Sequence, residues 1–111
     1  MSAFSEKGLL GELEQLVLLA ATHLDDEAYA VSIRDEIERR TGIEVSRGSV
    51  YVTLDRLDRK GYVNSWFGPP TPERGGKAKR HFRITAAGRR ALAAADLALT
   101  RMRQPRAATS R

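Results

Sequence analysis

The side chains best suited to chemistry in this sequence are cations, and they gather beside two glycines. The stretch FGPPTPERGGKAKRHF, residues 67–82, holds four of them: Arg74, Lys77, Lys79 and Arg80. Such cations can contact phosphates, and Gly75 and Gly76 let the backbone approach a polyanion without a side-chain clash. The prolines before them stiffen the approach to the loop tip. The same composition also suits a plain linker, so its role depends on the elements beside it.

Groups for acid–base or nucleophilic catalysis are scarce in the sequence. Its two histidines are His23, at the end of an apolar segment, and His81, on a strand-like segment among basic residues. The absence of cysteine excludes a disulfide framework, a thiolate metal site and a cysteine nucleophile. The GGKAK run lacks the earlier glycine and the final Ser or Thr of a nucleotide-binding P-loop. We therefore expect no enzyme activity, no metal and no cofactor.

The charge of the chain is divided unevenly between its two parts. Residues 1–38 carry two basic and nine acidic side chains, whereas residues 39–111 carry seventeen basic and five acidic ones, for a net charge of +5 over the 111 residues. The second part is therefore the expected anion-facing part. Glu12 and Glu14 interrupt the apolar N-terminal run, so we expect no signal peptide or membrane span and a cytoplasmic protein.

The elements that position these cations follow from apolar spacing and capping residues. Residues 9–24 are apolar around more than half of a helix, which predicts a largely buried helix. A second helix is expected from about Val31 to Gly42, which supplies a left-handed stop. A third is expected over residues 46–60, capped by Ser46 and closed by Gly61. Strands are expected at 62–67 and 79–84, and a last helix follows Thr85.

The third expected helix has two unlike sides. Val50, Leu54 and Leu57 recur on one side, whereas Ser49, Val52, Arg56 and Arg59 fall on the opposite side, which should stay outside the core. A helix of this kind after a helix and a short connection is typical of a helix-turn-helix, with the hairpin beside it as a wing. The fold prediction is mainly α with a small β-hairpin.

The predicted DNA-facing roles differ along this helix. Arg47 and Ser49 lie in the first turn, the part that usually reaches base edges. Tyr51 can pack its ring or donate its hydroxyl to a phosphate. Arg56 and Arg59 can contact phosphates or pair with neighbouring aspartates.

Three motifs, in order, resemble a known family. They are S-x-G-S-V-Y-x-T-L-x-R-L at 46–57, G-Y-V at 61–63 and R-G-G-x-x-K-R-x-F-x-I-T-x-x-G at 74–88. Together they closely resemble the PadR family of winged-helix transcriptional regulators, in its short-chain subgroup, over roughly residues 9–95. The resemblance implies a homodimeric, usually repressive regulator of double-stranded DNA, with helix 46–60 in the major groove, a characteristic DNA-side tyrosine matching Tyr51, and wing 68–80 on the backbone.

The resulting predictions divide the chain into a winged helix-turn-helix domain (1–85), a C-terminal dimerisation helix (86–103) and a flexible basic tail (104–111). The predicted DNA-binding residues are Ser46, Arg47, Ser49, Tyr51, Thr53, Arg56, Arg74, Gly75, Gly76, Lys77, Lys79 and Arg80. The predicted dimerisation residues are Leu9, Leu13, Leu92, Ala95, Leu99 and Met102. The last four form an apolar stripe at helical spacing, which a single chain could also bury against itself.

Several functions stay open at this stage. The chain stops soon after one C-terminal helix, so we expect no separate effector domain. A small-molecule effector of unknown identity, a constitutive repressor and a protein-responsive repressor are equally open. The competing interpretation is a winged-helix module that binds an acidic protein partner or RNA without DNA sequence specificity.

Overall fold

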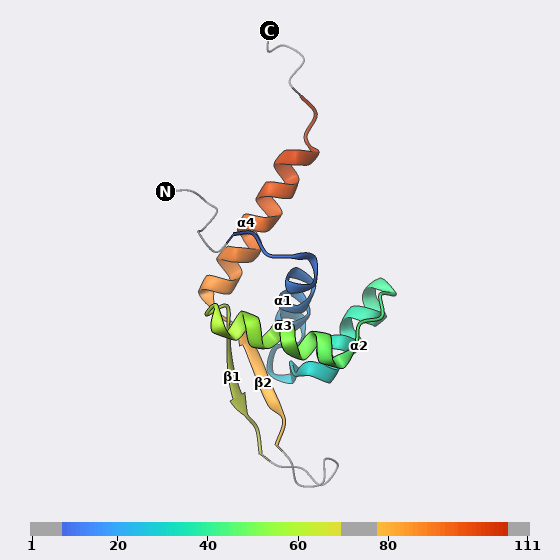
Figure 1. The fold of residues 1–111 in the computed structure, drawn as a ribbon, viewed down its shortest axis with the longest axis vertical. Coiled ribbons are helices and arrows are strands. Elements are labelled where there is room, and N and C mark those ends of the chain that lie inside the picture. Colours follow the sequence, from blue (N-terminus) through green and yellow to red (C-terminus); the bar gives the residue numbers. More distant parts are fainter. Residues whose placement is uncertain (1–7, 70–77, 107–111) are drawn as a thin grey trace.

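Four helices and one antiparallel hairpin make up the fold (Figure 1), seen in a computed structural model that describes residues 8–69 and 78–106. The elements in chain order are α1 (Glu12–Leu24), the short 3-10 helix η1 (Asp25–Glu27), α2 (Ala30–Thr41), α3 (Arg47–Arg59), β1 (Val63–Phe67), β2 (Arg80–Ile84) and α4 (Ala86–Arg103). Helices α1, α2 and α3 form the body, the hairpin extends from it, and α4 leads away on the other side. The predicted winged helix-turn-helix class is confirmed.

Helix α1 begins three residues later than its apolar run predicts. Gly11 is the residue before the helix, and its N–H donates to the Glu14 carboxylate at 2.8 Å. This cap fixes the first turn at Glu12, so Leu9 lies in front of the helix and is exposed.

The helix-turn-helix follows from two local signals in the sequence. Gly42, at φ 75°, takes the left-handed conformation that ends α2, and its N–H bonds the Glu38 carbonyl at 2.8 Å. The Ser46 hydroxyl then accepts the Ser49 N–H at 3.0 Å and starts α3. Both signals were predicted from the sequence, and both are confirmed.

The hairpin is in register from Val63 opposite Ile84 to Phe67 opposite Arg80. Its second strand also bonds the chain before α2, because the Phe82 N–H donates to the Ala28 carbonyl at 2.9 Å and Tyr29 bridges His81. The hairpin is therefore attached to the body along the outer edge of β2.

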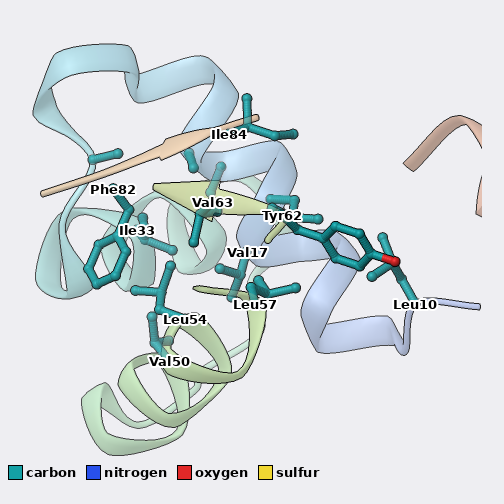
Figure 2. Close-up of a cluster of buried hydrophobic side chains, with 14 of the residues drawn as sticks. Leu10, Val17, Ile33, Val50, Leu54, Leu57, Tyr62, Val63, Phe82 and Ile84 are labelled. Carbon is teal, nitrogen blue, oxygen red and sulfur yellow. The ribbon is translucent and has the colours of Figure 1, made fainter. Parts of the chain in front are cut away.

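One hydrophobic core joins the helices to the hairpin (Figure 2). Val17 from α1, Ile33 from α2, Leu54 from α3 and Phe82 from β2 have no solvent exposure. Burying each such side chain contributes about 1.5–3 kcal/mol. Because each α-helix and each strand supplies a buried side chain, the core packs α3 against the hairpin.

Helix α4 starts against the body and then leaves it. The Thr85 hydroxyl accepts the Gly88 N–H at 3.0 Å and donates to the Gly61 carbonyl at 2.7 Å, which fixes the first turn to the end of α3. Ala95 is still buried, but Leu99 is exposed and Met102 is 83% exposed. Within residues 8–69 and 78–106, no helix is long and apolar enough to cross a membrane.

Candidate nucleic-acid interface

The outer side of α3 is exposed, as its residue pattern predicts. Val50, Leu54 and Leu57 have no solvent exposure, whereas Arg47, Ser49, Val52 and Arg56 are exposed. Ser46, the capping residue, also donates to the Ser49 hydroxyl at 2.9 Å, so the start of the helix presents an ordered pair of hydroxyls. A convex helix side with short polar and cationic residues in its first turn can enter a DNA major groove.

Thr53 lies on the buried side of α3. Its side chain is 4% exposed, and its hydroxyl donates to the Ser49 carbonyl at 2.8 Å. The hydroxyl is therefore satisfied within its own helix, and Thr53 is not among the DNA contacts that we propose. Arg59 takes one of its two expected roles, because it pairs with Asp55 at 3.4 Å on the exposed surface.

Tyr51 is 43% exposed and sits where α3 meets the hairpin. Its hydroxyl accepts a hydrogen bond of 2.7 Å from Arg80 at the start of β2. Arg80 also pairs with Asp58 at 2.8 Å, and its side chain is only 20% exposed. Sequence spacing could not reveal these two contacts, because Tyr51 and Asp58 are 29 and 22 residues from Arg80 and belong to a different element.

A cleft of about 490 Å³ separates the start of α3 from the loop end of the hairpin strands. Arg47 and Tyr51 line it from α3, Lys79 from the hairpin and Tyr29 from the residue before α2. The Lys79 ammonium lies 3.3 Å from the Tyr29 hydroxyl and 4.3 Å from the centre of its ring. With Arg80, which also lines it, the cleft thus presents three cations and two phenol groups, which suits a phosphate-bearing strand. Tyr29 was not predicted from the sequence, because an isolated aromatic between two helices carries no pattern.

The cations of the 67–82 stretch fall on both sides of the boundary of the described residues. Lys79 and Arg80 are at the loop end of the hairpin strands, but Arg74, Gly75, Gly76 and Lys77 lie outside the described residues. The role of these four stays a prediction.

The six predicted dimerisation residues fall into two groups. Leu13 and Leu92 are half-buried against the core, and Ala95 is buried in it. Leu9, Leu99 and Met102 are exposed on the outside of the molecule. The apolar stripe on α4 therefore packs within its own chain in its first half and is uncovered in its second half.

Electrostatic contacts hold α1 to the end of α3. The Glu14 carboxylate is buried and pairs with Lys60 at 2.9 Å. Burial raises the pKa of Glu14, but the Lys60 ammonium and the Gly11 N–H together lower it below its ordinary value. Glu14 is thus ionised at neutral pH and fixes the end of the helix that carries the interface.

Comparisons with known proteins identify the family. The model of the transcriptional regulator PadR-like family matches residues 17–94, whereas no curated protein matches the chain. Several solved structures share the fold, among them three PadR-like regulators. A PadR-like transcription factor from Bacteroides fragilis has a TM-score of 0.66 and 22% identity, over 81% of this chain and 82% of that one.

The other two structures are PadR family regulators as well. The Clostridium difficile R20291 protein has a TM-score of 0.65 and 17% identity, over 83% of this chain and 91% of that one. The Eggerthella lenta protein has a TM-score of 0.63 and 24% identity, over 82% of this chain and 79% of that one. The family match covers the helix-turn-helix, the hairpin and the first half of α4. The family model covers more than half of the chain, and the outer side of α3 and the cation-lined cleft agree with it. This chain therefore belongs to the PadR-like family of DNA-binding transcriptional regulators.

Proposed function

We propose that this protein is a homodimeric repressor that binds a roughly palindromic operator in a sequence-specific manner. The observation that carries the proposal is the exposed outer side of α3 next to the cleft lined by Arg47, Tyr51 and Lys79. A helix that enters the major groove needs cations and hydroxyl groups beside it, because phosphate contacts fix its register while base contacts select the sequence.

Within this proposal the residues divide by the part of DNA they meet. Arg47 and Ser49, in the first turn of α3, read base edges, and Ser46 supports them. Tyr51, Arg56 and Lys79 contact the backbone. The segment 68–80, with Arg74 and Lys77, follows the adjacent groove as a wing.

Dimerisation is proposed from the exposed apolar side chains. Leu99 and Met102 continue the α4 stripe beyond the body, and Leu9 is exposed in front of α1. A second copy related by a two-fold axis would cover them, since the same patch then meets itself. Two copies of α3 would then face half-sites about 10 base pairs apart, or a multiple of this.

Binding to the region upstream of the protein's own gene tests sequence specificity. We would measure fluorescence anisotropy with that duplex and with a random duplex of equal length and base composition, over about 50–200 mM salt. A specific regulator should prefer the upstream duplex by about 10³-fold or more. Equal affinity for both duplexes would refute specificity, and preference for RNA or an acidic protein would favour the competing function.

Repression and operator symmetry need separate measurements. Deleting the gene should raise transcription from a promoter that the protein occupies, whereas a fall would indicate activation. Hydroxyl-radical footprinting should protect two related half-sites. A single protected half-site would argue against a symmetric dimer on DNA.

A further inference from the structure

The hairpin is linked to α3 by a polar side chain, that of Arg80. One guanidinium nitrogen donates to the Tyr51 hydroxyl at 2.7 Å, and the other donates to Asp58 at 2.8 Å and to Ser65 at 3.2 Å. The guanidinium also lies 4.9 Å from the ring centre of Phe82, which is fully buried. Arg80 therefore joins an early turn of α3, the last turn of α3 and both strands.

We propose that Arg80 is a positioning residue: it sets the angle between the hairpin and α3 and orients the Tyr51 hydroxyl toward DNA, and it does not itself bind a phosphate. This inference rests on the proposed function and revises the role that the sequence suggested for Arg80.

The charge and burial of Arg80 oppose a phosphate contact. The Asp58 carboxylate compensates the guanidinium charge at hydrogen-bond distance, and Asp55 lies 3.9 Å away. To reach a phosphate, Arg80 would have to break a charge-assisted hydrogen bond and leave Asp58 without its cation. A planar group with several fixed donors suits the present role, because it can hold three partners at once.

The same hydrogen bond prepares Tyr51 for DNA. Because Arg80 donates to the phenol oxygen, the phenol proton is left to donate to an acceptor, such as a phosphate oxygen or a base edge. The guanidinium carbon also lies 5.6 Å from the centre of the Tyr51 ring, which restrains the ring. A restrained hydroxyl loses less conformational freedom on binding.

The first experiment separates positioning from charge. Arg80→Gln and Arg80→Lys would be titrated with the upstream duplex across salt. We expect each to weaken binding about tenfold with an unchanged salt slope. A phosphate contact predicts instead that Arg80→Gln lowers the slope by about 0.9 and that Arg80→Lys keeps both affinity and slope. That result would overturn the inference.

Arg83→Gln is the matched control. Arg83 lies on the same strand but on the opposite face of the hairpin, where it pairs with Asp26. We expect its replacement to change neither affinity nor slope. If Arg83→Gln weakened binding as much as Arg80→Gln, the effect would be a general one on the hairpin, and the inference would fail.

For Asp58→Asn, the positioning role and the phosphate-contact role of Arg80 predict opposite changes in DNA affinity. If Asp58 anchors a positioning residue, the variant weakens binding relative to Asp96→Asn, which removes the same charge from an exposed position on α4. If Arg80 is a phosphate contact held back by Asp58, the variant binds more tightly. If circular dichroism shows that Arg80→Gln does not fold, this comparison still distinguishes the positioning role of Arg80 from a phosphate contact.

A double-mutant cycle with Tyr51→Phe tests the link to DNA. The effect of Arg80→Gln should shrink to a few-fold or less when the Tyr51 hydroxyl is already missing. Fully additive effects would show that Arg80 does not act through Tyr51. If the wild-type protein shows no preference for its upstream duplex, the proposed function fails. If it shows the preference but Arg80→Gln leaves affinity unchanged, the positioning inference alone fails.

Discussion

At the scale of single residues, a close approach between two backbones depends on Gly88. A Cβ built at this position would lie 2.3 Å from the Tyr62 carbonyl oxygen and 2.8 Å from the Ile84 side chain. The first turn of α4 can therefore rest on the end of the α3–β1 connection only while residue 88 has no side chain.

Gly88→Ala should destabilise the protein by about 1–3 kcal/mol, because the added methyl group forces α4 away from Tyr62. Thermal unfolding would show a lower midpoint. Gly48→Ala is the control, because a Cβ at that position would lie 4.0 Å from its nearest neighbour, the Ser46 hydroxyl oxygen. Alanine also favours a helix, so Gly48→Ala should be neutral or stabilising. Equal effects of the two variants would contradict the close-approach argument.

The cations predicted for the wing can be tested by measuring DNA binding of substituted variants. Replacing Arg74 and Lys77 by Ala should weaken binding to every duplex alike and lower the salt slope by about 0.9 for each phosphate that is no longer neutralised. The matched control is Arg101→Ala with Arg103→Ala, which removes the same charge from the last turn of α4. An unchanged slope in the wing variant would show that these cations do not contact DNA.

At the scale of elements, α1 and α3 are joined by the buried Glu14 beside Lys60. Because the pKa of Glu14 is lower in the folded chain than its ordinary value of 4.5, ionised Glu14 stabilises the folded state. This contribution is complete above about pH 4.5 and disappears as the pH falls through the lower, folded value.

Glu14→Gln should therefore lower the free energy of unfolding by about 1.5–3 kcal/mol at pH 7. The difference from wild type should narrow as the pH drops below about 4.5, where wild-type Glu14 becomes protonated too. Chemical unfolding of both proteins at several pH values and one protein concentration measures this difference in the free energy of unfolding. Glu12→Gln, an exposed change on the same helix, should stay within about 0.5 kcal/mol. A pH-independent deficit in Glu14→Gln would contradict the ionic account.

How far the sequence predicts these elements depends on the range of the interaction. Ser46, Gly42 and Thr85 act on their own neighbours, so the starts of α3 and α4 and the end of α2 were predictable. Apolar spacing likewise identified the two sides of α3. The start of α1 was misplaced, because apolar periodicity continued through the Gly11 cap.

Long-range contacts at the candidate interface could not be predicted. The partners of Arg80 lie in two other elements, α3 and β1, so its basic character suggested a phosphate contact where the structure has an internal network. Thr53 bonds its own helix, and its predicted DNA contact stays a prediction. It follows the exposed Val52 in the chain, yet its own position on the helix turns it toward the core.

At the scale of the whole molecule, the two ends have different surfaces. The hairpin and the first turn of α3 present cations, whereas the far half of α4 presents apolar side chains together with Arg101 and Arg103. Figure 1 shows the hairpin and the far half of α4 at opposite ends of the body. A dimer formed through α4 would therefore leave the proposed DNA-binding side of each copy uncovered.

Leu99→Asp with Met102→Asp should convert the proposed dimer to a monomer, because two buried charges cannot be paired in a symmetric apolar interface. Sedimentation velocity measures the change, and operator affinity should fall with it. Thr100→Asp, on another side of the same turn, is the control and should stay dimeric. A double variant that still sediments as a dimer would place the interface elsewhere.

The pairing of β2 with Ala28 and Tyr29 has a consequence for solubility. A two-stranded hairpin that projects from a body exposes backbone donors and acceptors to which a strand of another molecule can add, as in fibril growth. Here the Phe82 N–H already bonds the Ala28 carbonyl, and Tyr29 bridges His81 beside it. The chain thus closes the β2 edge near the body with its own backbone, which protects a projecting hairpin from edge-to-edge aggregation at that point.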